Sequence, residues 1–120
     1  MNDYQMGVIE SRFADIIWEN EPISSTVLAH RSEELLKWKK STTYTVLKRL
    51  CDNVIFQNNG GVVTSLISKE EFYSMKSKQF VKETFDGSLP AFLAAFTSKN
   101  DLTAEEVAHL REIIKKYEEE

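Results

Sequence analysis

Apolar side chains recur three and four positions apart through the first 50 residues, which is the repeat of an amphipathic helix. The repeat falls into three segments: residues 6–18, residues from Ser24 or Ser25 to Trp38, and residues from about Ser41 to Leu50. Pro22 separates the first two, because proline cannot continue a helix and disfavours helical geometry in the residue before it. The pattern therefore predicts three consecutive short helices.

The pattern changes after residue 53. Residues 54–57 (VIFQ) and 62–67 (VVTSLI) are rich in β-branched and aromatic side chains, which is typical of strands. Residues 58–61 (NNGG) between them supply the positive-φ positions of a tight hairpin. Three helices followed by a two-stranded ribbon is the order of a winged helix-turn-helix, in which the third helix enters the major groove of DNA.

Helical patterns return in the second half of the chain. Residues 68–71 (SKEE) and 103–106 (TAEE) each match the capping box that begins a helix, and residues 86–90 (DGSLP) interrupt the pattern between them. In the last helix, apolar residues follow at 3, 4, 3 spacing, which is typical of a helix that packs along another helix. They are Val107, Leu110, Ile114 and Tyr117.

These patterns predict a mainly α fold with a small β-hairpin wing. We expect a winged helix-turn-helix DNA-binding domain over residues 1–69 and a helical dimerisation domain over residues 70–120. The C-terminal stripes are too apolar to leave in water, and a chain of 120 residues has only a modest core as a monomer. A homodimer is therefore expected.

Charge is divided unevenly along the chain. Residues 1–69 carry eight Lys or Arg and eight Asp or Glu, whereas residues 70–120 carry seven and eleven, which accounts for the net charge of −4. Between Lys37 and Arg49 the chain holds five cations and no carboxylate. Because nucleic-acid binding depends on the local patch rather than the net charge, the predicted third helix is a candidate phosphate-binding surface.

The sequence gives no positive sign of enzyme or metal chemistry. Cys51 is the only cysteine, and His30 and His109 fall in different predicted helices without ligand spacing. No nucleophile, zinc-protease or phosphate-loop motif is present. We expect no catalytic residue, no cofactor and no bound metal. No apolar run approaches ~18 residues and no signal peptide begins the chain, so a cytoplasmic protein with no membrane partner is expected.

Several quoted stretches together resemble the BlaI/MecI/CopY penicillinase-repressor family of winged-helix transcriptional regulators over nearly the whole chain. They are IIWEN (16–20), the Trp38 to Leu50 stretch ending in STTYTVLKRL, SKEEFYSMKSKQFVKETFDGSLPAFLAAF (68–96) and DLTAEEVAHLREIIKK (101–116). The resemblance implies a homodimeric bacterial repressor. Its N-terminal winged helix would bind a two-fold symmetric, double-stranded operator, and its C-terminal helices would form the dimer.

Site residues follow from the predicted third helix and from the resemblance. The expected DNA-binding residues are Lys39, Lys40, Ser41, Thr42, Tyr44, Thr45, Lys48 and Arg49. The expected dimerisation residues are Phe92, Phe96, Val107, Leu110, Ile114 and Tyr117. The resemblance also implies a regulatory protease that cuts in the dimerisation region at an Asn-Phe bond. The nearest match is the Ala95–Phe96 bond, which lacks the Asn.

An alternative function comes from the acidic net charge and the uncharged hairpin tip. A winged helix with these properties is also compatible with a protein-protein interaction module that does not bind DNA. The sequence leaves both hypotheses open.

Overall fold

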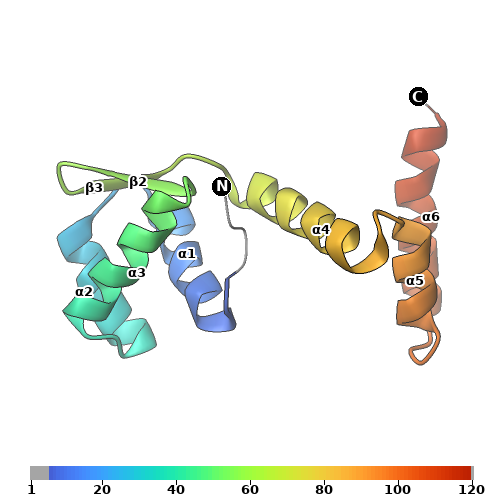
Figure 1. Cartoon of the computed structure of the whole chain (residues 1–120), viewed down its shortest axis with the longest axis horizontal. Helices are drawn as coiled ribbons and strands as arrows, with labels where there is room; N and C mark the ends of the chain where they lie inside the picture. The colour runs from blue at the N-terminus through green and yellow to red at the C-terminus, as the bar shows by residue number, and fades with distance from the viewer. Residues whose placement is uncertain (1–5, 120) are drawn as a thin grey trace. The chain divides into compact units, whose positions relative to one another are not determined.

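The computed structural model describes residues 6–119 (Figure 1). Its helices and strands, in chain order, are α1 (Val8–Asn20), β1 (Ile23–Ser24), α2 (Ser25–Leu36), α3 (Lys40–Asp52), β2 (Phe56–Asn59), β3 (Val62–Ser65), α4 (Lys69–Phe85), α5 (Leu89–Thr97) and α6 (Ala104–Glu118). The mainly α fold with a small sheet confirms the predicted fold class. The chain forms two compact units that divide between Lys78 and Gln79, inside α4.

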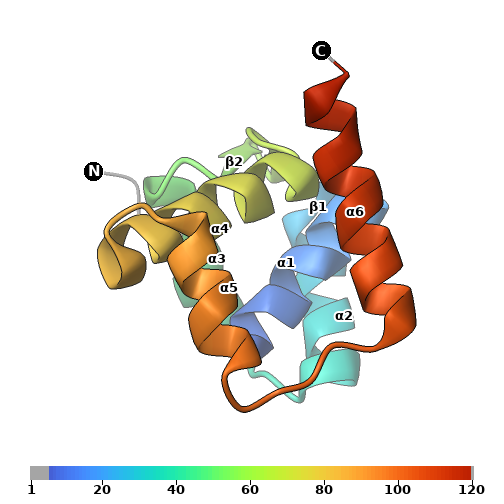
Figure 2. The same ribbon diagram turned by 90° about the vertical axis from the view of Figure 1, so that its right-hand side faces the viewer.

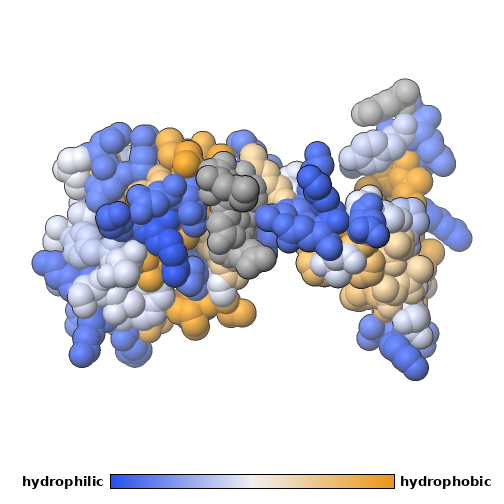
Figure 3. All heavy atoms as spheres, viewed as in Figure 1, coloured by the Kyte–Doolittle hydropathy of each residue, from blue (hydrophilic) through white to orange (hydrophobic). Residues whose placement is uncertain are grey.

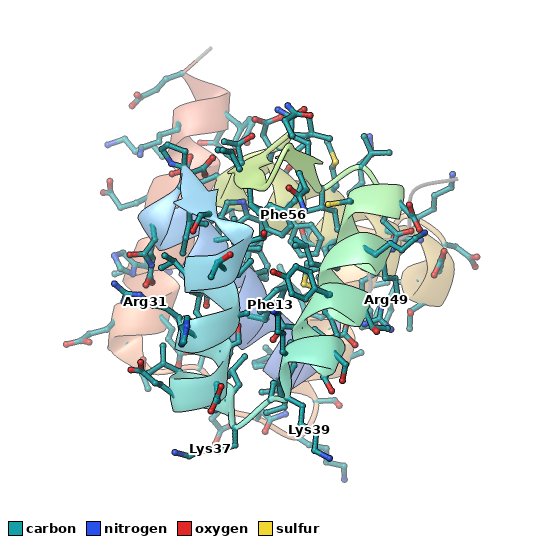
Figure 4. The ribbon with its side chains drawn as sticks, turned by 90° about the vertical axis from the view of Figure 1, so that its left-hand side faces the viewer. Phe13, Arg31, Lys37, Lys39, Arg49 and Phe56 are labelled. Carbon is teal, nitrogen blue, oxygen red and sulfur yellow. The ribbon has the colours of Figure 1, made fainter. Side chains whose placement is uncertain are left out.

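The first unit is built around one apolar core. Its helices α1, α2 and α3 turn the apolar stripes inward against the sheet, and Phe13 and Phe56 lie between α2 and α3 in Figure 4. The side chains that are almost fully buried there include Phe13, Ile17, Leu28, Leu47, Leu50, Ile55, Phe56 and Val63. Burying one such side chain stabilises the fold by about 1.5–3 kcal/mol. Because Leu47 and Leu50 lie on one face of α3, their burial fixes which face of α3 packs on the core.

The helix-turn-helix begins and ends at well-defined caps. Ser24 is the N-cap of α2, and its hydroxyl accepts a hydrogen bond from the Val27 N–H at 3.1 Å, which selects Ser24 from the two predicted caps. Lys37 ends α2 in the left-handed conformation, with φ of 60°. Trp38 then packs on Phe13, with ring centroids 5.1 Å apart. The left-handed cap at Lys37 and the packing of Trp38 on Phe13 therefore fix the short segment 37–39 between α2 and α3.

The sheet differs from the predicted two-stranded ribbon. It has three strands in the order β1-β3-β2, because Ile23 and Ser24 pair antiparallel with Val63 and Val62. This strand follows Pro22 directly, where the extended conformation that a proline favours suits strand pairing. A two-residue segment is too short to show alternation in the sequence, which is why the pattern missed it.

The hairpin is also shifted relative to the sequence prediction. Asn58 and Asn59 belong to β2, so the loop contains only Gly60 and Gly61, with φ of 58° and 89°. Two positive φ values in a two-residue loop make the tight hairpin turn that matches the twist of the strands. Val54 and Ile55 precede β2 in a turn, where Val54 has φ of 63°.

The start of α4 is fixed to the first unit by three contacts. The Trp18 indole N–H donates to the Ile67 carbonyl at 3.1 Å, and the Trp18 ring packs on Phe72 with centroids 5.7 Å apart. Lys69 forms an ion pair with Asp15 at 2.8 Å, and the hydrogen bond in this pair raises the pKa of Lys69. The first turn of α4 therefore belongs with α1.

The second unit contains the end of α4 with α5 and α6. Figure 2 shows α5 and α6 joined by a loop and running in opposite directions. Thr103 and Glu106 form the predicted capping box of α6, with both reciprocal hydrogen bonds present. The other predicted box differs, because the Glu71 carboxylate accepts from the Ser68 hydroxyl rather than its backbone N–H.

Four phenylalanine rings pack together in the second unit. Phe92 contacts Phe80, Phe85 and Phe96, with ring centroids 5.5–6.2 Å apart. Among residues 79–119, none is buried within one copy of the chain. The apolar residues of this unit therefore stay largely exposed.

Candidate nucleic-acid interface

Helix α3 separates its side chains onto an inner and an outer face. Thr43, Leu47 and Leu50 are buried against the core, and a set of polar residues faces solvent. That set is Lys40, Ser41, Thr42, Thr45, Lys48 and Arg49. The inner face fixes the rotation of α3, so the same residues that fill the core also determine which polar side chains are presented.

The unpaired cations gather where α2 ends and α3 begins. Figure 4 shows Lys37 and Lys39 projecting outward from this turn. Among the described residues, no carboxylate lies within 4 Å of the ammonium groups of Lys37, Lys39 or Lys40. These three charges are therefore available to a phosphate without breaking an ion pair.

The two cations nearer the end of α3 are already paired. Lys48 contacts Asp52 at 3.1 Å, and the Arg49 guanidinium contacts Glu10 of α1 at 2.5 Å. In Figure 4, Arg49 lies on the side of α3 away from α2. The Lys48–Asp52 pair is largely exposed, and exposed pairs contribute little, so Lys48 can exchange its carboxylate for a phosphate at small cost. The Glu10 side chain is only 27% exposed, so the Arg49 pair is partly shielded from solvent.

Tyr44 occupies a position between α3 and α2. Its ring is half-buried, its hydroxyl lies 3.4 Å from the Ser25 hydroxyl, and the Lys40 ammonium lies 6.0 Å from the ring centroid. The Ser25 N–H in turn donates to the Gly61 carbonyl at 2.8 Å. Ser25 thus connects α3 to the hairpin turn, a contact that the sequence analysis missed because periodicity does not report which loops meet.

The exposed threonines differ in their freedom to donate. The Thr45 hydroxyl donates to the Ser41 carbonyl at 2.9 Å, which leaves its oxygen as an acceptor. Ser41 and Thr42 lie in the first turn of α3, and their side chains are exposed. The first turn therefore offers hydroxyl groups that can donate or accept.

The wing carries amides rather than charges. Asn58 accepts a hydrogen bond from the Gly61 N–H at 3.0 Å, and Asn58, Asn59 and Gly60 are exposed. This tip can form hydrogen bonds with a nucleic acid but supplies no positive charge to phosphates.

The predicted dimerisation residues all lie in the second unit. Phe92, Val107 and Leu110 are half-buried, whereas Phe96, Ile114 and Tyr117 are exposed. Ala95 and Phe96, the predicted cleavage position, are both exposed on α5. The surface view shows apolar residues over this part of the molecule (Figure 3).

Groups that could support other chemistry are dispersed. His30 lies on α2 and His109 on α6, while Cys51 is half-buried near the end of α3. Within residues 6–119, no three His, Cys, Asp or Glu side chains gather in a way that could hold a metal ion. None of the helices in the described part of the chain is long and apolar enough to cross a membrane.

The family model described as "Penicillinase repressor" matches residues 6–116. The chain belongs to the penicillinase repressor family. The match covers both units, and it confirms the resemblance noted in the sequence.

Individual relatives of the penicillinase repressor family agree over similar lengths. The methicillin resistance regulatory protein MecI of Staphylococcus aureus (strain Mu50 / ATCC 700699) is 26% identical, covering 94% of this chain and 95% of the relative. MecI of Mammaliicoccus sciuri is 25% identical with the same coverage. The penicillinase repressor of Bacillus licheniformis is 21% identical, covering 94% of this chain and 91% of the relative. Their names describe regulators and repressors, which supports the prediction of a non-enzymatic protein.

Proposed function

We propose that this chain is a transcriptional repressor that binds double-stranded operator DNA as a homodimer. The carrying observation is the exposed polar and basic face of α3, which a buried inner face holds outward in a member of the penicillinase repressor family. A helix so presented is the element that a winged helix-turn-helix inserts into the major groove.

The side chains of α3 divide into two proposed roles. Ser41, Thr42, Tyr44 and Thr45 would contact base edges, because hydroxyl groups and an aromatic ring can read the major groove. Lys39, Lys40, Lys48 and Arg49 would contact phosphates and set affinity without sequence preference. Lys37, Lys39 and Lys40 form no ion pair among the described residues and lie at or beside the first turn of α3. This position supports the proposed contacts with phosphates.

The second unit supports the proposed homodimer. None of its large apolar side chains is fully buried within one copy, and contiguous exposed apolar surface marks sites of association. A closed two-fold dimer would present two copies of α3 in opposed orientation, which calls for a two-fold symmetric operator. Its half-sites would lie about one helical turn apart, ~34 Å, or a small multiple.

The runner-up is a protein-protein interaction module. The observations that favour it are the uncharged wing tip and the pairing of Lys48 and Arg49 with carboxylates of the same chain. Both features reduce the positive field that DNA would meet. This alternative predicts that the chain binds the promoter duplex no more tightly than an unrelated acidic protein does at low salt.

Fluorescence anisotropy with the promoter DNA upstream of the chain's own gene tests the proposal. We expect the full-length protein to bind this duplex at least 100-fold more tightly than a shuffled duplex at the same salt concentration, because specific repressors discriminate by ~10³ or more. Footprinting should show two related protected half-sites. Equal, weak binding of both duplexes would contradict the repressor and favour the interaction module.

A further inference from the structure

The wing tip carries the only Asn-Gly dipeptide of the chain, Asn59–Gly60. Asn59 is the last residue of β2, an edge strand of the sheet, and Gly60 begins the turn of the β2–β3 hairpin (Figure 1). Both residues are exposed, and a Cβ added to Gly60 would meet no atom within 4 Å. Water therefore reaches this dipeptide freely.

Turn geometry does not account for the asparagine at position 59. Asparagine is favoured in hairpin loops because it tolerates a positive φ. Here the loop residues are Gly60 and Gly61, whereas Asn59 pairs with Val62 in the ladder and has no positive φ. The turn therefore does not require an amide at position 59.

The neighbouring Asn58 is engaged by the turn, whereas Asn59 is not. The Asn58 side-chain oxygen accepts a hydrogen bond from the Gly61 N–H at 3.0 Å. Within residues 6–119, neither the Asn59 side chain nor the Gly60 N–H has a hydrogen-bond partner. The amide carbon of Asn59 and the backbone nitrogen that follows it are thus both free to react.

We propose that Asn59 is a site of spontaneous deamidation and that this modification weakens the binding of operator DNA. The Gly60 backbone nitrogen attacks Cγ of Asn59, and the new C–N bond closes a succinimide ring. The side-chain nitrogen leaves as ammonia and takes the proton that Gly60 loses. Water then opens the ring at one of its two carbonyls, which gives either aspartate or isoaspartate, in which the chain continues through Cγ.

The folded hairpin sets the rate of this reaction. Ring closure needs a backbone rotation that the extended conformation of β2 opposes, so the end of the strand has to open first. The Asn59–Val62 pair is the last pair of the hairpin, and loop tips open locally at low free energy. We therefore expect slower deamidation in the folded protein than in the unfolded chain, with Asn59 well ahead of Asn58.

Deamidation would place a carboxylate on a wing tip, residues 58–61, that has no charge of its own. In the proposed repressor this hairpin lies beside the duplex, and a negative charge there repels phosphates within a Debye length of about 10 Å. Isoaspartate also adds a carbon to the backbone next to the turn. The effect on DNA rests on the proposed function, whereas the reaction at Asn59 does not.

Peptide mapping by mass spectrometry tests the reaction. Full-length protein is held in one buffer at physiological temperature and sampled over several days. We expect Asn59 to deamidate about tenfold faster than Asn58, because Asn58 must first break its hydrogen bond. Asn59→Gln is the control, since its longer side chain closes a larger ring and should stay unmodified. Deamidation of Asn59 no faster than that of Asn58 would overturn the proposed site.

Fluorescence anisotropy with the promoter duplex tests the effect on DNA. Asn59→Asp carries the charge of the deamidated residue, and Asn59→Gln is its neutral control. We expect Asn59→Asp to bind ~5-fold more weakly than the parent protein at low salt, with a smaller difference at high salt, because salt screens the repulsion. Asn59→Gln should bind as the parent does. Equal affinity of all three proteins, or equal weakening of both variants, would contradict an effect of the charge.

The unmodified parent separates this inference from the proposed function. If the parent does not prefer the promoter duplex to a shuffled one, the proposed repressor is wrong and the effect on DNA is wrong with it. The peptide mapping still decides whether Asn59 deamidates. If the parent binds the promoter specifically and Asn59→Asp binds equally well, only the effect of deamidation on binding is wrong.

Discussion

The Glu21 carboxylate accepts hydrogen bonds from both the backbone N–H and the hydroxyl of Ser65, at distances of 2.8–2.9 Å. Glu21 is the C-cap of α1, and Ser65 is the last residue of β3. The pair joins the first helix to the strand that carries the wing, across 44 positions of sequence. The wing is therefore positioned by a charged side chain at its base as well as by the sheet.

Replacing Glu21 should loosen this connection. Glu21→Ala removes the acceptor of hydrogen bonds to a charged group, and we expect the free energy of unfolding to fall by about 1.5–3 kcal/mol. Glu21→Gln keeps one oxygen acceptor and should cost less. Urea denaturation followed by circular dichroism measures both values, and equal stability of all three proteins would show that the contact contributes nothing.

Replacing the buried Thr43 should not lower the stability of the fold, in contrast to replacing Glu21. The Thr43 side chain is fully buried in α3, and among the described residues no hydrogen-bond partner lies near its hydroxyl. A buried hydroxyl without a partner is costly, so Thr43→Val should leave stability unchanged or raise it by about 1 kcal/mol. Thr43→Ala, which creates a cavity, is the control. A Thr43→Val protein less stable than Thr43→Ala would show that the hydroxyl has a partner.

The proposed division of labour on α3 predicts two kinds of binding defect. The combined change Lys39→Ala and Lys40→Ala should weaken binding to all duplexes alike and lower the salt dependence of log K by about 2, since ~0.9 counterions are released per phosphate contact. Thr42→Val should instead change the ratio between operator variants. Anisotropy titrations at several salt concentrations distinguish the two. A changed operator preference in the lysine variant would refute the division.

Much of the first unit could be predicted because its information is local. Periodicity identified three helices, and Ser24 was one of the two N-caps that the sequence offered for the second of them. In the second unit, the Thr103 cap is likewise a short-range signal. The additional strand Ile23–Ser24 could not be predicted, since its two residues become a strand only by pairing with Val62 and Val63. The extension of β2 to Asn59 could not be predicted either, because the backbone angles at Gly60 and Gly61 decide where β2 ends.

Some features of the candidate site could be predicted from the sequence and others could not. The exposed polar residues of α3 follow from its helical repeat, so their outward position could be predicted. The contacts of Arg49 with Glu10 and of Tyr44 with Ser25 join residues 39 and 19 positions apart, and nothing in a local pattern selects those partners. The roles of the site residues in binding stay predictions that the experiments above test.

Cleavage at the predicted position should weaken DNA binding. Ala95 and Phe96 lie inside α5, where the Ala95 carbonyl accepts from both the N–H and the hydroxyl of Ser98. A cut at this bond would separate α6 from the rest of the chain. A full-length protein with a short protease recognition loop inserted at this bond should bind the promoter before cleavage and lose at least tenfold in affinity after it. Unchanged affinity in the cleaved protein would exclude α6 from operator binding.

Cys51 should react slowly with alkylating agents. Burial, and to a smaller extent the nearby Asp52 carboxylate, raises the pKa of the Cys51 thiol. Because the thiolate is the nucleophile, the folded protein needs a higher pH than the unfolded chain to reach the same rate. Iodoacetamide labelling followed by mass spectrometry across pH 7–10 should show this delay, and it should vanish in urea. Equal rates in both states would contradict the shielding of this thiol.

The two-glycine turn of the wing also limits how this surface can change. Gly61, with φ of 89°, adopts a conformation that side chains rarely take, and Asn58 is engaged with the N–H of Gly61. Asn59 is therefore the position in this hairpin loop region where a new side chain meets neither backbone strain nor a lost hydrogen bond. A lineage or a designer that needs stronger attachment to the DNA backbone can reach it through one codon, by placing lysine there, while the rest of the turn stays as it is.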